Sequence, residues 1–183
     1  ATEEKNELAM RLTDSGHVIF FTLQDGTMLQ DVTLPIPQGV TITTLGTAEP
    51  TTGVLALGLS NGHALVIKHE YSVSYPNGLQ QRQITPKLVY PLGEATIVID
   101  QQGLPLTALD VQGSSEGGIL TAITADHRIV MVSVQKQESL LDESVTLEQQ
   151  QVVLPLQNGE LDFILLSRDQ RTLYVANKLG EVI

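Results

Sequence analysis

Apolar and polar residues alternate along most of the chain with the two-residue period of a β-strand, and few stretches look helical. The clearest unit is strand, turn, strand, which recurs over residues 7–23, 53–67, 118–134 and 171–183. Each unit predicts a hairpin, and Asn-Gly suits the positive φ angles of a two-residue turn. The expected turns are Ser15-Gly16, Asn61-Gly62, Asp126-His127 and Leu179-Gly180.

A second element follows each of the first three hairpins and ends in an apolar string that contains proline: VTLPI, LVYPL and VVLPL. The prolines are Pro35, Pro91 and Pro155, and a glycine comes soon after each of them, at positions 39, 93 and 159. Proline cannot donate a hydrogen bond to a β-ladder, so we expect each of these strands to lie at an outer edge of its sheet.

Another apolar strand, at residues 40–46, 104–112 and 161–167, leads into the next hairpin, so the repeating unit has four strands. Four antiparallel strands that repeat every few tens of residues are typical of a propeller blade. We therefore predict an all-β fold: a single partial β-propeller, a WD40-like arc of three to four blades at 1–37, 38–93, 94–158 and 159–183. The Trp-Asp mark of the WD40 class itself is absent, and Gly16-His17 and Gly62-His63 lie at the middle hairpin, which is the wrong place for its Gly-His blade-end mark.

The later repeats are longer than the first, and the additional residues fall at 71–83 and 95–103, where we expect loop insertions. Stacked repeats bury their apolar faces only against neighbours, so we expect further blades or an oligomer through open blade edges. The beginning ATEEKNELAM has no signal-peptide pattern, and LGEVI ends inside an expected strand. These ends suggest a piece of a longer protein.

One segment has a pattern that also fits a helix in place of the expected strand. Residues 139–151 carry Ser139 with Asp142 three positions on, followed by helix-tolerant Glu and Gln. This is a capping pattern, so a short helix competes with a strand there.

Composition narrows the function classes. The chain has 183 residues, 42% of them hydrophobic, which is enough for a substantial core. Its apolar runs are far shorter than the roughly 20 residues of a membrane span. The net charge of −11 disfavours nucleic acid and anionic membrane surfaces as partners. With no cysteine, disulfides and Cys-based zinc sites are excluded.

A short motif resembles a catalytic one. Residues 58–62, GLSNG, match the G-x-S-x-G pattern of the hydrolase nucleophile elbow, with Ser60 as nucleophile and His63 beside it. That elbow needs a strand running into a helix, whereas strand alternation continues here. We therefore interpret Ser60 as a turn residue and predict no catalytic residue.

Metal and cofactor sites are not expected. His17 and His63 follow a turn glycine at equivalent repeat positions, but His69 and His127 complete no zinc pattern. The aspartates at 14, 31, 110 and 126 lack the spacing of a calcium loop. The stretch Gly113 to Gly118 resembles a phosphate-cradling loop but contains Glu116, has no Walker lysine and lies between two strands. We interpret it as a flexible connection, with anion contact as the alternative.

The region from Leu55 to Val182, especially ALGLSNGHALVIKHEYSVSYPNGLQQRQITPKLVYPLGE and ADHRIVMVSVQKQESLLDESVTLEQQ, resembles the long soluble insertion of a bacterial family. The family comprises the extended permease subunits of phosphate-type ABC transporters in gamma-proteobacteria. The resemblance implies a parent protein in the inner membrane that takes part in phosphate uptake, with this domain in the periplasm. No functional residue of that family is carried onto a numbered position.

Three functions are compared. The first is a non-enzymatic interaction or regulatory module of such a permease, which contacts the substrate-binding protein or another transporter subunit. The second is a general protein-interaction propeller of cell-envelope assembly or scaffolding. The third is a propeller hydrolase or lyase, which is disfavoured because the inner strands carry mostly Ala, Leu, Ile and Thr.

Overall fold

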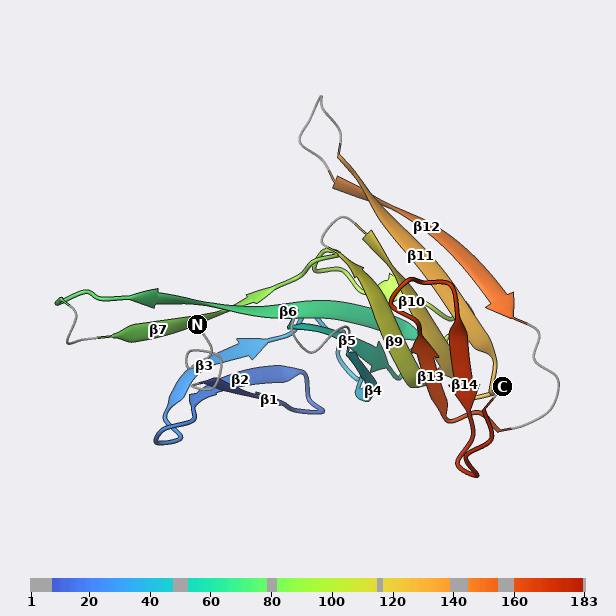
Figure 1. The fold of residues 1–183 in the computed structure, drawn as a ribbon, viewed down its shortest axis with the longest axis horizontal. Coiled ribbons are helices and arrows are strands. Elements are labelled where there is room, and N and C mark those ends of the chain that lie inside the picture. The colour runs from blue at the N-terminus through green and yellow to red at the C-terminus, as the bar shows by residue number, and fades with distance from the viewer. Residues whose placement is uncertain are drawn as a thin grey trace.

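The computed structural model describes residues 8–47, 53–78, 82–114, 117–138, 145–154 and 160–182. Within these ranges every regular element is a β-strand, which confirms the all-β prediction. The strands pair antiparallel in four sheets that follow one another along the chain (Figure 1). In this part of the chain no helix is present that is long and apolar enough to cross a membrane.

The first sheet has the order β1-β2-β3, and the second has the order β4-β5-β6-β7 with β8 paired to β6. Their bounds are β1 Leu8–Leu12, β2 His17–Thr22, β3 Met28–Thr33, β4 Ile42–Thr47, β5 Val54–Leu59, β6 His63–Ser74, β7 Gln83–Val89 and β8 Ile97–Val98.

The third sheet has the order β12-β11-β10-β9, and the fourth joins β13 and β14. Their bounds are β9 Leu106–Ser114, β10 Gly117–Thr124, β11 Ile129–Glu138, β12 Val145–Leu154, β13 Phe163–Leu166 and β14 Leu173–Ala176. An isolated antiparallel bridge joins Ala176 of the fourth sheet to Val182. The blade boundaries predicted from the sequence stay a prediction.

The hairpin turns form at the predicted positions, but the Asn61-Gly62 turn does not have the two-residue geometry expected from the sequence. At Asn61-Gly62 only the glycine has positive φ, +80°, and its N–H donates to the carbonyl of Leu59 over 3.2 Å. A two-residue type I′ turn needs positive φ at both residues, so this hairpin has a tight turn closed by a single left-handed residue. His127 takes the same left-handed position, with φ 63°, in the hairpin of the third sheet.

The proline-ended strands lie at sheet edges. β3 and β7 are edge strands, and Pro35 and Pro91 follow them directly. This confirms the prediction for these two prolines. β12 is also an edge strand, but Pro155 lies outside the described residues.

One alternative and one expectation about local structure give way to strand pairing. From Val145 to Gln151 the suggested helix is part of β12, because each residue pairs with β11, while residues 139–144 lie outside the described ranges. Residues 71–74 of the expected loop insertion at 71–83 instead extend a hairpin, since Tyr71 to Ser74 pair with Pro86 to Gln83. The extended hairpin of β6 and β7 projects from the body in Figure 1.

The insertion at 95–103 is also not a plain surface loop. It contains β8, and Ile97 and Ile99 are buried, with 2% and 0% exposure. These side chains join the core between the second and third sheets. Apolar burial therefore holds this segment against the sheets it connects.

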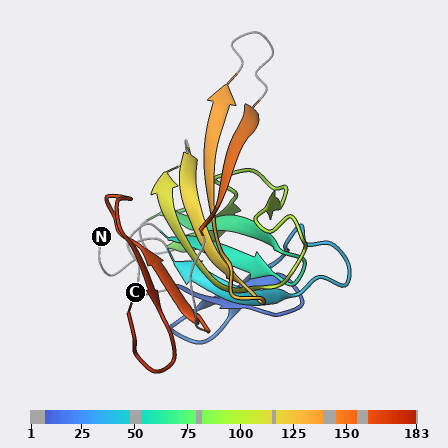
Figure 2. The same ribbon diagram turned by 90° about the vertical axis from the view of Figure 1, so that its right-hand side faces the viewer.

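Successive sheets pack face to face through three separate apolar cores. The first lies between the first and second sheets, the next between the second and third, and the last between the third and fourth. Figure 2 shows the sheets fanning out in chain order. The representative buried residues are Phe20 and Leu65 in the first core, Val66 and Leu120 in the second, and Ile129 and Ile164 in the third.

The first strands of the last three sheets lie next to one another. Thr43 of β4 donates its hydroxyl to the carbonyl of Leu106 in β9 over 2.6 Å. The backbone N–H of Leu166 in β13 donates to Oδ2 of Asp110 in β9 over 2.7 Å. We call β4, β9 and β13 the inner strands because they share one side of the fan.

Candidate functional site

A buried carboxylate lies where the second sheet leads into the third. The Asp100 side chain is only 1% exposed, and its backbone N–H donates to the carbonyl of the turn glycine Gly62 over 2.9 Å. One carboxylate oxygen accepts the N–H of Leu104 over 2.9 Å, and the other lies 3.0 Å from Nη2 of Arg128. A buried charge needs such partners, since leaving it unpaired is costly.

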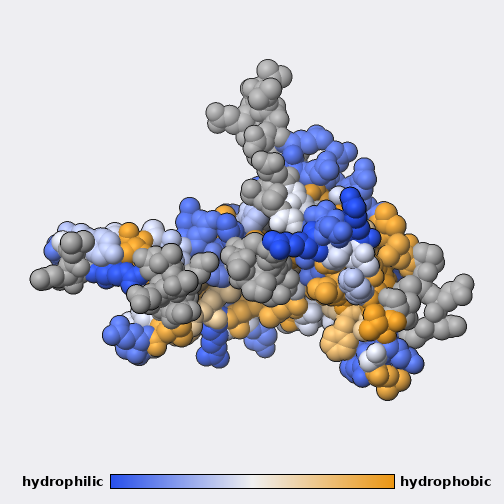
Figure 3. Space-filling model, in the orientation of Figure 1, coloured by the Kyte–Doolittle hydropathy of each residue, from blue (hydrophilic) through white to orange (hydrophobic). Residues whose placement is uncertain are grey.

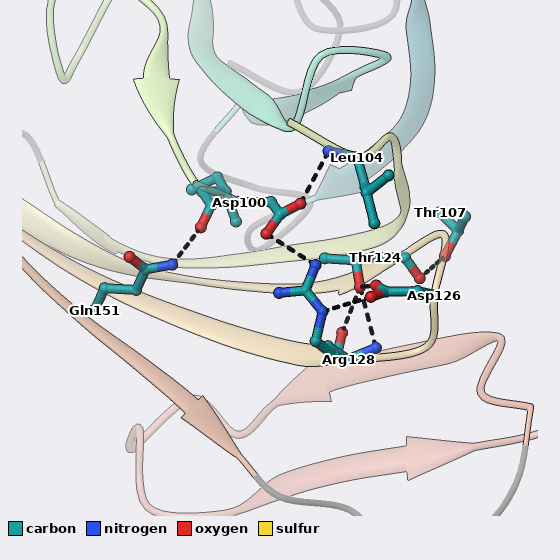
Figure 4. Close-up of polar contacts among 8 residues, drawn as sticks. Asp100, Leu104, Thr107, Thr124, Asp126, Arg128 and Gln151 are labelled. Carbon is teal, nitrogen blue, oxygen red and sulfur yellow. Dashed lines mark hydrogen bonds and ion pairs between the residues drawn. The ribbon is translucent and has the colours of Figure 1, made fainter. Parts of the chain in front are cut away.

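Arg128 belongs to the next sheet and holds a second carboxylate. Its Nε donates to Oδ2 of Asp126 over 2.7 Å, within the turn between β10 and β11 (Figure 4). Thr124 donates its hydroxyl to the other oxygen of Asp126. These hydrogen bonds, first that of Arg128, lower the pKa of Asp126, and the Asp126 contact raises the pKa of Arg128. Asp126 and Arg128 are therefore both charged at neutral pH and hold each other in place.

Gln151 on β12 adds a fourth segment to this network. Its Nε2 donates to the carbonyl of Ile99 over 2.8 Å. We call residues 96–104 the 96–104 segment; it overlaps the insertion at 95–103. The network of Asp100, Asp126, Arg128 and Gln151 thus joins this segment to the third sheet at two places, the turn before β11 and strand β12. The carboxylates face protein donors, so the network is suited to holding two sheets together rather than to binding substrate.

A second buried carboxylate, Asp110, joins the third and fourth sheets. Asp110 is 3% exposed, and this burial raises the pKa of its carboxyl. Hydrogen bonds from the backbone N–H groups of Leu166 and Val111 act in the opposite direction but are the smaller effect. Gln112 adds a hydrogen bond from Nε2 to the carbonyl of Leu166 over 3.3 Å. Side chains of β9 therefore pair with an edge of β13.

Ser60 lies in a hairpin turn between two strands. Its backbone N–H donates to the carbonyl of Thr41, and its hydroxyl oxygen accepts the N–H of Thr41 over 3.0 Å. The ring of His63 instead lies 2.9 Å from the hydroxyl of Thr96. The strand-to-helix context of a nucleophile elbow is not formed here, and Ser60 and His63 have different partners.

The other predicted candidates are also separated. Nδ1 of His17 lies 3.0 Å from Asp31 within the first sheet, while Nδ1 of His127 accepts the N–H of Leu161 over 3.3 Å. In the described ranges, no group of three or more His, Asp or Glu side chains is arranged to hold a metal ion.

The glycine-rich stretch lines a cleft of about 410 Å³ between the second and third sheets. A Cβ on Gly113 would lie 2.4 Å from the Cα of Gly118, so close strand approach already accounts for that glycine. Two lysines line the cleft, and Lys68 is paired with Glu70 over 3.0 Å. Ser115 and Glu116 lie outside the described residues, so the predicted flexible connection and the alternative of anion contact both stay predictions there.

Asp100 and Arg128 were not identified from the sequence. The available signal was a single aspartate that ends the apolar run IVID, and a single arginine that precedes the apolar run IVMV. Such isolated charges beside buried strands indicate paired residues, but their partners are far apart in the sequence.

Comparison with known proteins assigns no family. A scan against models of protein families gives no match, and a search of curated proteins gives no significant match either.

Proposed function

We propose that this chain is an arc of a β-propeller that serves as a non-catalytic protein-interaction module. One observation carries the proposal: four consecutive antiparallel sheets pack face to face, with β4, β9 and β13 side by side. Propeller blades are four-stranded antiparallel sheets arranged radially, and the packing of consecutive antiparallel sheets supports this proposal. The single arc of 1–183, with its blades at 1–37, 38–93, 94–158 and 159–183, belongs to this proposal.

The chemistry of the described side chains supports binding rather than catalysis. The polar networks that cross between sheets are made of internally paired groups, such as Asp100 with Arg128. The net charge of −11 gives the module an acidic field that favours partners with basic patches.

We further propose, from the resemblance of residues 55–182, a place for the module in a phosphate ABC transporter permease. It would lie on the periplasmic side of the inner membrane and contact the substrate-binding protein or another subunit. An acidic surface is a poor attractor for free phosphate, so the proposed ligand is a protein.

The test is binding of the purified chain to a purified periplasmic phosphate-binding protein, measured by isothermal titration calorimetry. We expect saturable binding that weakens as salt is raised, because complementary charges are screened. A binding protein for another solute, matched in size and charge, is the control. Equal binding to both proteins, or to neither, would contradict the transporter role.

A further inference from the structure

The four sheets can be aligned position by position through their turns. In the four turns predicted from the sequence, one for each sheet, the N–H of the fourth residue donates to the carbonyl of the first. The donor and acceptor pairs are Gly16 and Thr13, Gly62 and Leu59, His127 and Thr124, and Gly180 and Asn177. Residues at the same distance from these turns therefore occupy equivalent places, and the strand registers extend the alignment to the inner strands.

We call the face of a sheet that looks toward the next sheet in the chain its front. In the second sheet Gly46 and Ala56 are a cross-strand pair on this face, and in the third sheet Asp110 and Thr121 are the equivalent pair. All four residues are buried; Ala56 and Thr121 have 0% exposure.

In the fourth sheet the equivalent pair is Leu165 and Tyr174, and both are exposed, by 55% and 47%. Phe163 and Val182 share this face, with 59% and 68% exposure. The front of the fourth sheet is thus an apolar surface at positions that the two preceding sheets bury. Hydrophobic surface gathers at this end of the molecule in Figure 3.

On the first sheet, no other described part of the chain packs on the opposite face, or back, as a neighbouring sheet does on the second sheet. In the second sheet Leu65 and Ile67 lie on the back and are 0% and 1% exposed. Their equivalents in the first sheet are Ile19 and Phe21, which are only partly buried, and Met28 pairs with Phe21 and is 59% exposed. Among the residues that the structure describes, one front and one back are therefore left without a packing partner.

The two faces also differ in a complementary way at the inner strand. At the second sheet, the absence of a side chain on Gly46 admits β9, since a Cβ there would lie 2.3 Å from the carbonyl oxygen of Leu109. Leu165 fills that position in the fourth sheet. Among the described residues, the first sheet has no inner strand, because β1 is an edge strand where β5 pairs with β4. We infer that a neighbour packed on this back need not have a glycine at the position that Gly46 holds.

We propose that the front of the fourth sheet docks on the back of the first sheet of a second copy of this chain. Each copy has one of each face, so two head-to-tail contacts would close a ring of two copies. Four sheets from each copy make eight, which lies within the four to eight blades of known propellers. The pairing depends on the propeller packing proposed above and not on a transport role.

The test is sedimentation equilibrium of the whole chain over a range of concentrations, at low and high salt. The wild type is expected to form dimers that salt strengthens, because each copy carries a charge of −11. Leu165→Asp on the front and Met28→Asp on the back should each raise the dissociation constant about tenfold or more, since each would bury an unpaired charge. Val153→Asp is the matched control, because Val153 is 47% exposed on β12, outside both faces.

A mixture gives the sharpest result. Leu165→Asp keeps an intact back and Met28→Asp an intact front, so the two variants together should form a heterodimer that neither forms alone. Circular dichroism verifies that each variant is folded. A wild type that stays monomeric would overturn the second-copy contact and leave the proposed propeller arc untouched. A dimer that survives Leu165→Asp would also overturn it.

Discussion

At the scale of single residues, two buried carboxylates connect the sheets and differ in what stabilises them. Asp100 lies beside a permanent cation, Arg128, at 3.0 Å. Among the described residues, the carboxylate of Asp110 accepts hydrogen bonds from backbone N–H groups, and burial raises the pKa of its carboxyl. Removing charge at the two positions should therefore have opposite effects on stability.

Arg128→Met should lower the free energy of unfolding by about 3 kcal/mol, because it leaves the Asp100 carboxylate buried and unpaired. Water reaches part of Arg128, whose side chain is 25% exposed, so we expect the lower end of the range for buried pairs. Adding Asp100→Asn should recover part of the loss. The measurement is urea unfolding followed by circular dichroism.

Lys178→Met is the control for Arg128, since Lys178 is 81% exposed in its pair with Asp162. That variant should stay within about 0.5 kcal/mol of the wild type. Strictly additive losses for Arg128→Met and Asp100→Asn would contradict a direct pair.

Asp110→Asn should stabilise the protein at neutral pH, by a margin that shrinks as the pH falls toward 4. Burial raises the folded pKa above the unfolded value of 3.8, so the folded state binds the proton more tightly. The ionised form destabilises the fold above the folded pKa, and this effect disappears below the unfolded pKa. Unfolding in urea across this pH range measures the margin; a margin independent of pH would disprove a buried ionised Asp110.

At the scale of elements, the hairpin turns fix the geometry of the sheets and also contact the polar network. Gly62 has φ +80°, and a Cβ there would lie 3.0 Å from the carbonyl oxygens of both Asp100 and Leu104. Gly26 has a similar φ of +72°, with nothing within 4 Å. Substitutions at these two glycines therefore distinguish the cost of backbone strain, which both share, from the cost of crowding, which arises at Gly62 alone.

Gly26→Ala should destabilise the fold by about 1 kcal/mol, the cost of placing a side chain in the left-handed region. Gly62→Ala should cost clearly more, because it also displaces the segment that carries Asp100. Thermal and urea unfolding of the two variants give the comparison. An equal decrease in the free energy of unfolding for both variants would mean that the 96–104 segment moves to accommodate the added methyl group without cost.

The elements that the sequence predicted well are those fixed by neighbours in the chain. The turn at Asn61-Gly62 and the edge strands before Pro35 and Pro91 depend on local φ preferences and on the missing N–H of proline. The buried segment at 95–103 was missed because it is held by Arg128 and Gln151, which are far along the chain. Helix propensity after Ser139 was overridden by pairing with β11.

At the scale of the whole molecule, the three cores are distinct groups of residues, each shared by only two neighbouring sheets. Such a chain behaves as a row of units whose stability is a sum of local and nearest-neighbour terms. A perturbation in one core should therefore stay near that core. The Asp100 network and the Asp110 contact are the polar links that carry coupling from one unit to the next.

Phe20→Ala tests this behaviour, since Phe20 is 1% exposed in the core between the first and second sheets. The substitution should destabilise that core by about 3–5 kcal/mol. Measured by hydrogen–deuterium exchange, β1 to β3 should exchange much faster, while β13 and β14 keep their wild-type rates. Val175→Ala, in the core between the third and fourth sheets, is the reciprocal variant and should speed exchange in β13 and β14 alone. If either substitution accelerates exchange equally in all four sheets, the chain unfolds as one cooperative unit and its sheets are not independent neighbours.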